Sequence, residues 1–378
     1  MLDYYFAVIL ITIMLMVVSL LQLSENKTFS RKIKENYITI AIFIILGAFC
    51  EFCNVRYDTY PGGSKTIHGI IKAIELSVAP IIPILYVRII DHPKNDKIPK
   101  LISNILILCN IAFQVSSIFV PFIFYIDDTN VYNHGKYYYI YIVIYITNIF
   151  IFIIELLQYT KRYQMRNLKS LIAILCFLFL GLSIHWVNSD IRTDWLVVGI
   201  IFTMFLVYYS DLSLKVDALT DLLNRNSYQF ILKKLDYRSI IIIFDCNNFK
   251  EVNDTYGHLI GDDVLKIIAK EIMNVYSKYG YCYRIGGDEF AVIFKQGVID
   301  NIGNISNFVE GLNSKFNSLI EEYDQERYPL QNGVSIGWSV FEGIYGVNSR
   351  DENYIDSLVK GTLKNADQNM YQNKQDNK

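Results

Sequence analysis

The stretches Ile240-Ile-Ile-Ile-Phe-Asp245 and Arg284-Ile-Gly-Gly-Asp-Glu-Phe290 decide the fold of the second half of this chain. The first predicts a buried strand that ends in a carboxylate, because four isoleucines and a phenylalanine in succession leave it no polar face. The second predicts two strands joined by a Gly-Gly turn, with two acidic residues directly after it. If the three strands are neighbours, Asp288 and Glu289 come to lie next to Asp245.

The elements around these stretches alternate between helix and strand. Apolar residues recur with helical or strand periodicity in segments bounded by polar turns. This order, with one hairpin, indicates an α+β domain in which helices cover an open sheet. We predict helices at Leu219–Lys234, Asp262–Tyr279, Ile302–Glu322 and Ile355–Asn373, and strands at Ser239–Phe244, Tyr281–Ile285, Glu289–Phe294 and Asn332–Val340.

The acidic residues indicate a cation and a nucleotide. Two carboxylates that converge on one point repel each other unless a cation joins them, and with a triphosphate that cation is Mg²⁺. Gly286 and Gly287 would let the backbone approach a phosphate and would supply the positive φ of a tight hairpin. Gly-Gly-Asp alone is a common turn, and an Asp after a strand is unremarkable. The combination with Asn253, His258, Asp262 and a lysine-bearing last helix is far more specific.

Further motifs accompany these residues: Asp217-Ala-Leu-Thr-Asp-Leu-Leu-Asn-Arg225, the run from Asp245 to Leu265, Val334-Ser-Ile-Gly337 and Ala366-Asp-x-x-Met-Tyr371. With Gly286–Phe290 they resemble the GGDEF family of diguanylate cyclases, in the family's order and spacing. The resemblance covers about the last 160 residues. It implies a ferredoxin-like sheet related to polymerase palms, and the condensation of two GTP molecules to cyclic di-GMP and pyrophosphate.

The resemblance implies a metal site and catalytic groups at the acidic residues. The metal, Mg²⁺ or alternatively Mn²⁺, would be held by Asp245, Asp288 and the backbone carbonyl of Cys246. Glu289 would be a second acidic group at the metals. Asp288 is also expected to activate the attacking hydroxyl, so the catalytic candidates are Asp288 and Glu289.

The resemblance also implies how GTP is bound. Asn253 and Asp262 would read guanine, since a carboxylate accepts from guanine N1–H and N2–H₂, and adenine offers no such pair of donors. Each domain holds one GTP, so catalysis requires a homodimer with two antiparallel substrates. The substrate-binding candidates are Asn248, Phe249, Lys250, Asn253, His258, Asp262, Arg284, Gly286, Gly287 and Lys374.

The chain departs from the family's pattern in three respects. Asn247 stands where an Asp is frequent, which is expected to weaken metal binding modestly. Asp221 replaces a frequent Gly at what we predict to be a helix start. The family's product-inhibition motif, Arg-x-x-Asp, reads Ser277-Lys-Tyr-Gly280 here, so we expect no feedback by the product.

The chain as a whole is too apolar for one ordinary soluble fold, and its long apolar runs lie up to about Tyr209. Hydrophobic residues make up 52% of the sequence and charged residues 19%, and a spanning helix needs roughly 17–25 mostly apolar residues. We predict an all-α bundle of seven transmembrane helices at 1–209, a linker at 210–216 that continues the last helix, and the cyclase domain at 217–378. The apolar segments are Tyr4–Leu23, Tyr37–Cys53, Ile67–Ile90, Leu101–Phe124, Tyr137–Gln158, Leu168–Val187 and Trp195–Tyr209.

The loops between these segments predict the orientation. Lysine and arginine gather in the first, third and fifth loops, and basic loops stay cytoplasmic. The N-terminus is therefore expected outside and the C-terminal domain inside, where GTP is available. We expect a multi-pass protein of the bacterial cytoplasmic (inner) membrane that responds to an unidentified small-molecule or membrane signal. The net charge of −2 offers no basic field for nucleic acid.

Polar residues inside the spans are candidates for function. Glu155 and His185 are best explained as residues near the membrane boundaries. Glu75 is different, because Pro80 and Pro83 follow it and would free carbonyls for a ligand or a neighbouring helix. Two other functions remain open: a degenerate domain that binds GTP or cyclic di-GMP without catalysis, and a transporter regulated by a nucleotide-sensing domain.

Overall fold

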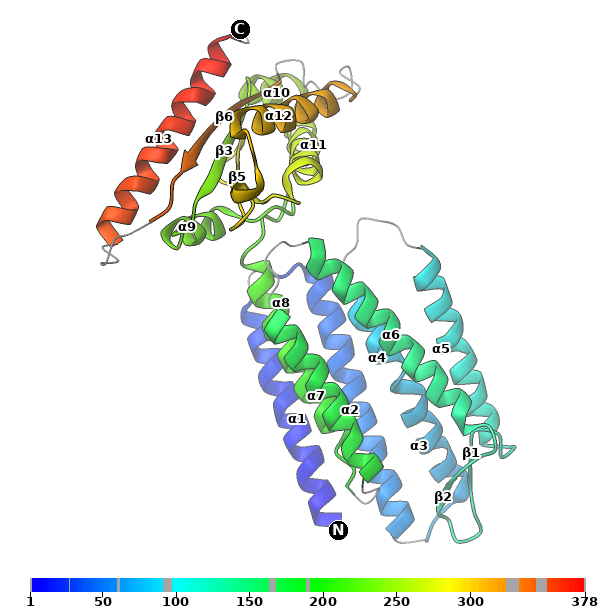
Figure 1. Ribbon diagram of the computed structural model, residues 1–378. Coiled ribbons are helices and arrows are strands. Elements are labelled where there is room, and N and C mark those ends of the chain that lie inside the picture. The colour runs from blue at the N-terminus through cyan, green and yellow to red at the C-terminus, as the bar shows by residue number, and fades with distance from the viewer. Residues whose placement is uncertain are drawn as a thin grey trace. The chain divides into compact units, whose positions relative to one another are not determined.

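The chain forms two compact units, Met1–Asp211 and Leu212–Lys378 (Figure 1). The structure is a computed structural model and describes residues 2–26, 28–59, 62–90, 97–162, 168–187, 191–323, 333–344 and 352–376. The division falls inside the predicted linker at 210–216.

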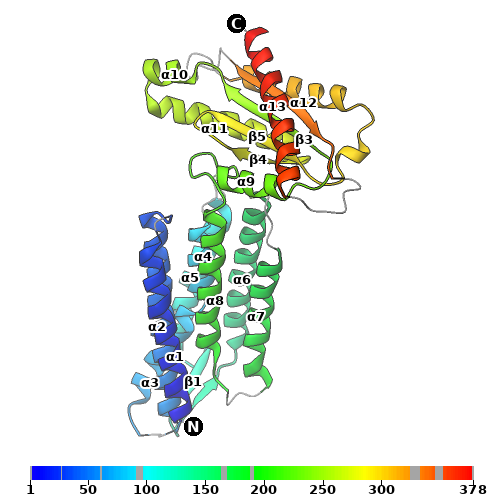
Figure 2. The ribbon, with the colours of Figure 1, turned by 90° about the vertical axis from the view of Figure 1, so that its left-hand side faces the viewer.

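The first unit is helical with one small hairpin. Figure 2 shows its helices running along one another, with the hairpin near the end where the chain begins. The helices are α1 (Leu2–Glu25), α2 (Arg31–Thr59), α3 (Lys65–Val78), α4 (Ile81–Ile89), α5 (Lys97–Ser117), α6 (Tyr138–Arg162), α7 (Leu168–Val187) and α8 (Asp194–Ser213), and the strands are β1 (Phe124–Ile126) and β2 (Tyr132–His134).

Five helices of the described ranges are long and apolar enough to cross a membrane: Leu2–Glu25, Arg31–Thr59, Lys65–Ile89, Tyr138–Gln158 and Asp194–Ser213. Two further apolar helices, Leu101–Ser117 and Ile172–Gly181, are shorter. The unit therefore has several potential spans, and the number of seven stays a prediction. The side chain of His185, predicted near the outer boundary, lies outside the described residues.

The fourth apolar segment is shorter as a helix than its sequence predicts. Helix α5 ends at Ser117, and the rest of the predicted segment Leu101–Phe124 turns into the β1–β2 hairpin. The Ser117 hydroxyl accepts a hydrogen bond from the Ile123 amide at 2.9 Å, which fixes the turn. A local side-chain acceptor of this kind competes with helix continuation.

The prolines of the third segment interrupt it, and neighbouring helices use the carbonyls there. Helix α3 ends before Pro80, which has no N–H to donate to the Leu76 carbonyl. The Asn110 side chain donates to that carbonyl instead, at 3.1 Å. The Asn148 side chain donates to the Pro80 carbonyl at 3.0 Å. The sequence leaves open whether a ligand or a neighbouring helix uses carbonyls freed by the prolines. The described contacts show hydrogen bonds from neighbouring helices.

The second unit is built on a four-stranded antiparallel sheet in the order β4-β5-β3-β6. This order, with helices between the strands, is the expected ferredoxin-like arrangement. The strands are β3 (Ser239–Cys246), β4 (Gly280–Arg284), β5 (Glu289–Phe294) and β6 (Val334–Phe341), and the helices are α9 (Arg225–Lys233), α10 (Phe249–Tyr256), α11 (His258–Tyr276), α12 (Ile305–Glu321) and α13 (Glu352–Asp376), with a short 3₁₀ turn, η1 (Ile299–Asn301).

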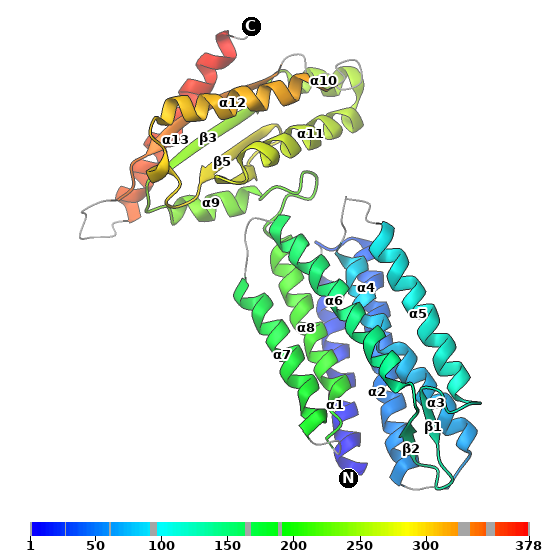
Figure 3. The same cartoon turned by 45° about the vertical axis from the view of Figure 1, so that its right-hand side comes forward.

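Alternate residues of β3 separate the two faces of the sheet. Ile240, Ile242 and Phe244 belong to a core with apolar residues of α11 and α12, and Figure 3 shows these two helices over the sheet. On the opposite face, α9 contacts β4 through the rings of Tyr228 and Tyr283, 5.4 Å apart, and α13 packs on β6. Strand β3 is thus covered on both faces, which explains its continuous apolar sequence.

The predicted opening helix at Leu219–Lys234 is wrong in its first part. Helix α9 begins only at Arg225, after a turn. The Asp217 carboxylate accepts from the amide of Thr220 at 3.0 Å, and Asp221 has a left-handed φ of 59°. Asn224 then caps α9 by accepting from the Ser227 amide at 3.0 Å. Helix α8 ends at Ser213 and does not continue into α9.

Candidate active site

The three acidic candidates lie at one end of the central strands. Asp245 is the penultimate residue of β3 and is the register partner of Glu289 on β5. The Cys246 amide donates to the Asp288 carbonyl oxygen at 3.1 Å, which brings the backbone of the turn against the end of β3. The sheet register therefore collects the carboxylates as the sequence predicts.

The acidic residues repel one another. Burial, and next the negative charge of Asp245, raise the pKa of Asp288 above its ordinary value. The same two causes, in the same order, raise the pKa of Glu289. The protein therefore keeps an excess of negative charge at this point, and a cation would relieve it.

The Gly-Gly turn is tight for a different reason from the predicted one. Neither Gly286 nor Gly287 has a φ in the left-handed region, so the predicted positive φ is wrong. A Cβ at Gly286 would lie 2.6 Å from Glu289 Oε2 and 3.2 Å from Glu289 Cβ, so a side chain there would displace the Glu289 carboxylate. A Cβ at Gly287 would meet nothing within 4 Å. The open side of the turn is thus at Gly287.

Arg284 holds the turn in place. Its guanidinium donates to the Gly287 carbonyl from Nε at 3.2 Å and from Nη2 at 2.7 Å. It also pairs with the Asp217 carboxylate at 3.0 Å, and the pair is largely buried. The described contacts of Arg284 therefore join the turn to the segment before α9.

The last helix brings a lysine to the acidic residues. A Cβ at Gly337 would lie 2.6 Å from Met370 Cβ and closer still to the Ala366 carbonyl oxygen, so α13 packs directly on the backbone of β6. From that position the ammonium group of Lys374 donates to the Asp245 carboxylate. The lysine predicted to bind phosphate thus stands at the carboxylates.

Two asparagines of α13 fix the helix along β6. The Asn373 side chain accepts from the Ile336 amide at 3.2 Å, and the Asn369 side chain donates to the Trp338 carbonyl at 2.9 Å. We did not predict these contacts from the sequence. The available signal was the spacing of four residues between two asparagines on one helix face.

The predicted guanine-binding residues gather where α10 meets α11. A Cβ at Gly261 would lie 3.3 Å from the ring of Phe249 and closer still to the Asn253 side-chain oxygen. The missing side chain of Gly261 therefore lets these two groups lie against α11, one residue before the partly buried Asp262. Asn248 directly precedes α10 and has a left-handed φ of 54°. Asn248, Lys250 and His258 are exposed.

Two hydrogen bonds hold Asn247 in place, and an Asp at this position could make both of them. Its side-chain oxygen accepts from the Ser335 hydroxyl at 2.7 Å, and its backbone amide donates to the Gly333 carbonyl at 3.2 Å. The residue is buried against the start of β6. Its described side-chain contact thus joins the residue after β3 to β6.

The donor set fits a hard divalent cation. Carboxylate and carbonyl oxygens are the ligands that Mg²⁺ prefers, and Asp245, Asp288 and Glu289 supply the carboxylates. Burial raises the pKa of the Cys246 thiol to about 12, and a hard cation prefers oxygen to sulfur, so Cys246 would contribute its carbonyl. Within the described ranges, no three His, Cys, Asp or Glu side chains surround one point as a bound ion requires. The carboxylates would have to draw together around a cation.

Residues 214–378 match the family described as "Diguanylate cyclase, GGDEF domain", and this part of the chain is a GGDEF domain. The probable diguanylate cyclase DgcI of Escherichia coli K12 is 39% identical over 24% of this chain and 21% of its own length. The signaling protein YkoW of Bacillus subtilis is 31% identical over 43% of this chain and 19% of its own length. The chain thus spans about a fifth of the length of these two relatives.

A solved structure shows a similar domain. The GGDEF domain of DgcB from Caulobacter crescentus, in complex with c-di-GMP, is 21% identical, with a TM-score of 0.33. The match covers 43% of this chain and 90% of that chain.

Proposed function

We propose that the GGDEF domain at residues 214–378 condenses two molecules of GTP to cyclic di-GMP and pyrophosphate. The observation that carries the proposal is the meeting of Asp245, Asp288 and Glu289 at one end of the sheet, with Lys374 beside them. Diguanylate cyclases of this family generally use a divalent metal. Here Asp245, Asp288, Glu289 and the Cys246 carbonyl would hold it, and when bound it neutralises charge on the phosphates.

The reaction requires a proton acceptor and a positive charge, and the site offers both. The 3′-hydroxyl of one GTP attacks the α-phosphorus of the other, and the bond to the pyrophosphate oxygen breaks. The carboxylate of Asp288 accepts the hydroxyl proton. The ammonium group of Lys374 moves from Asp245 to the phosphates. Two such transfers close the ring and release two pyrophosphates, and catalysis is mostly positioning.

Base recognition is proposed for the junction of α10 and α11. The Asp262 carboxylate accepts from guanine N1–H and N2–H₂, and the Asn253 amide supplies a complementary pair of groups. Phe249 and Asn248 line the same place. The backbone amides at 248–250 and the exposed side chain of Lys250 face the phosphates. Arg284 holds the turn through the Gly287 carbonyl, and His258 borders the pocket.

Two domains are needed for one product. Each domain binds one GTP, so the attacking hydroxyl and the α-phosphorus belong to different subunits, and we propose a homodimer. The helices of the first unit anchor the chain in the bilayer, with seven crossings, the N-terminus outside and the GGDEF domain in the cytoplasm. The alternating basic loops support this orientation. The first unit would receive a small-molecule or membrane signal.

The test is product formation by the full chain with GTP and Mg²⁺, beside the Asp288→Asn variant. We expect cyclic di-GMP from the parent protein and a loss of at least about a hundredfold in the variant, as for removal of a group that acts on the reacting atoms. Lys364→Met, which replaces an exposed lysine on α13, is the matched control. A folded dimer that binds GTP without forming product would instead identify a receptor.

A further inference from the structure

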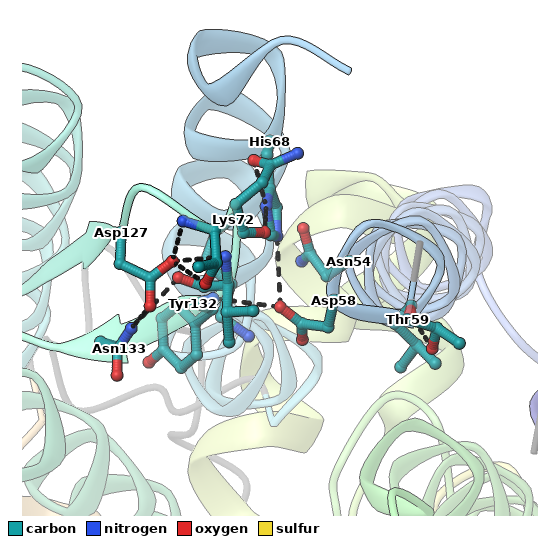
Figure 4. A network of polar contacts seen from close by, with 12 residues as sticks. Asn54, Asp58, Thr59, His68, Lys72, Asp127, Tyr132 and Asn133 are labelled. Carbon is teal, nitrogen blue, oxygen red and sulfur yellow. Dashed lines mark hydrogen bonds and ion pairs between the residues drawn. The ribbon is translucent and has the colours of Figure 1, made fainter. Parts of the chain in front are cut away.

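Polar contacts fasten the β1–β2 hairpin of the first unit to α2 and α3. The Tyr132 amide donates to the Asp58 carboxylate at 3.0 Å, and the Lys72 ammonium group lies 4.3 Å from the centre of the Tyr132 ring. Figure 4 shows Asp58, His68 and Lys72 close together beside Tyr132. Side chains from two helices thus converge on one short hairpin.

His68 is buried among these contacts, and only one of its ring nitrogens has a partner. The side chain is 0% exposed and stacks on the Tyr57 ring, with the ring centres 5.0 Å apart. Nδ1 lies 3.1 Å from the Asn130 carbonyl oxygen and 3.3 Å from the Asn130 side-chain oxygen, so Nδ1 carries a proton and donates. Nε2 has no hydrogen-bond partner among the described residues, and Asp58 Oδ1 lies 3.9 Å from it.

A neutral imidazole cannot satisfy both sides of this site. With its proton on Nδ1, the neutral ring has only an acceptor at Nε2, and an acceptor forms no hydrogen bond with a carboxylate. A buried polar atom that is left unpaired is costly. The protonated ring donates from both nitrogens, so it can bind Asn130 and Asp58 at the same time. The hydrogen bonding of His68 is therefore complete only in the charged form.

The charged groups around the imidazole leave room for this extra bond. Lys72 donates to Glu75 at 3.0 Å, and Arg192 donates to Asp58 Oδ2 at 3.2 Å, so each nearby cation is held by an acid. The Tyr132 amide occupies one site on Asp58 Oδ1. A carboxylate has about four acceptor sites, so Asp58 can accept from His68 without releasing Arg192 or the hairpin.

We propose that His68 is a proton-binding site that closes the hairpin on α2 and α3. When the pH falls, Nε2 gains a proton and moves to donate to Asp58. One imidazolium then joins α2, α3 and the hairpin. Under the orientation proposed above, the hairpin lies outside the membrane and the proton comes from there. The inference concerns the first unit alone and holds whether or not the GGDEF domain is active.

Asp127 holds the hairpin loop and stays ionised while histidine titrates. Its carboxylate accepts from the Thr129 hydroxyl at 2.6 Å and from the Val131 amide at 3.0 Å. These hydrogen bonds lower the pKa of Asp127 to about 2. A response between about pH 5 and 8, where histidine changes its charge, therefore does not come from Asp127.

The test is amide hydrogen exchange of the full chain in lipid nanodiscs, read by mass spectrometry on peptides that cover 124–134. Exchange is expressed as a protection factor, which removes the direct effect of pH on the chemical rate. We expect the protection of the hairpin to rise about tenfold or more between about pH 8 and pH 5, as a hydrogen bond to a charged group predicts.

Three variants locate the response. His68→Gln should remove the rise. Asp58→Asn should shrink it, because an asparagine can donate to the neutral ring as well as accept from the charged one. His134→Gln is the matched control and should keep the rise, since His134 lies on β2 and stacks on the Tyr138 ring, 3.8 Å between ring centres.

Three results would overturn the proposal. Constant protection of the parent hairpin over this pH range would show that Nε2 is satisfied without an added proton. Protection that falls at low pH would show that repulsion by Lys72 and Arg192 outweighs the new bond to Asp58. A rise that persists in His68→Gln would place the titrating group elsewhere. The first two results need only the parent protein, so the proposal can be refuted even if a variant does not fold.

Discussion

Replacing Gly337 by alanine should push the C-terminal helix off the sheet. The new Cβ would lie 2.6 Å from Met370 Cβ and closer still to the Ala366 carbonyl oxygen. A backbone carbonyl within a helix cannot rotate out of the way, so α13 itself must shift. The shift would carry Lys374 away from Asp245.

The cost can be estimated from the contacts involved. Forcing an extra methyl group into a packed interface costs about 1–3 kcal/mol. The hydrogen bonds of Asn369 and Asn373 to β6 would weaken as well, at about 0.5–1.5 kcal/mol each. We therefore expect the local stability of α13 to fall by about 3 kcal/mol, which corresponds to roughly hundredfold faster amide exchange.

Hydrogen exchange of the full chain, read by mass spectrometry on peptides from α13 and β6, measures this directly. Gly361→Ala is the matched control, since it lies in the same helix and its Cβ would meet nothing within 4 Å. That change should slow exchange, because alanine is favoured over glycine in a helix by about 0.5–1 kcal/mol. If Gly337→Ala left the protection of both elements unchanged, our account of how α13 is positioned would be refuted.

Three further predictions concern the site. Asp288→Asn should stabilise the GGDEF unit at pH 7 without nucleotide. Folding raises the pKa of Asp288, so the folded state favours the neutral form of this side chain. The parent protein therefore has its full stability below the ordinary pKa of Asp288 and loses stability as the pH rises through the raised pKa, whereas the asparagine variant does not. The gain, read from thermal unfolding, should shrink towards pH 3, and a constant gain at all pH values would contradict it. Lys374→Met should weaken GTP binding about tenfold or more, because a hydrogen bond to a charged group is worth about 1.5–3 kcal/mol. A binding titration with GTP measures this, and the control Lys364→Met should bind GTP as the parent protein does. Cyclic di-GMP should not inhibit turnover at saturating GTP, because Ser277-Lys-Tyr-Gly280 replaces the family's inhibitory motif; inhibition at low product concentrations would show a different feedback site.

The sheet and its acidic end were predictable because their signals are local and strong. A short apolar run rich in β-branched isoleucine and bounded by polar turns, as at Ile240–Phe244, favours a strand covered on both faces. The Gly-Gly turn then fixes the hairpin, and sheet register places Glu289 opposite Asp245. The predicted approach of the carboxylates follows from this pairing alone.

The segment before α9 was not predictable from periodicity. Leu219, Leu222 and Leu223 suggest a helix, but Asp217 captures the Thr220 amide and Asp221 adopts a left-handed conformation. Short polar side chains can bind nearby amides and so compete with helix formation. Asp221 stands at a position of positive φ, where a glycine would fit without strain.

The contacts of Arg284 and Lys374 depend on elements distant in the sequence. Arg284 meets Asp217, 67 residues earlier, and Lys374 meets Asp245, 129 residues earlier. A single sequence shows that these side chains are charged but not which partner each selects. In the first unit, the pairing of Lys72 with Glu75 is local, whereas that of Arg192 with Asp58 required the structure.

Both outer strands of the GGDEF sheet are partly covered along their free edges, which bears on how fragments of this protein will behave in solution. Leu223 donates to the Cys282 carbonyl at 3.0 Å and accepts from the Arg284 amide at 2.8 Å, so the segment before α9 covers β4. The asparagines of α13 cover β6 at Ile336 and Trp338. A fragment that starts after residue 224, or stops before residue 369, exposes a strand edge that can recruit a second chain and aggregate. A soluble fragment should therefore keep 215–224 and all of α13.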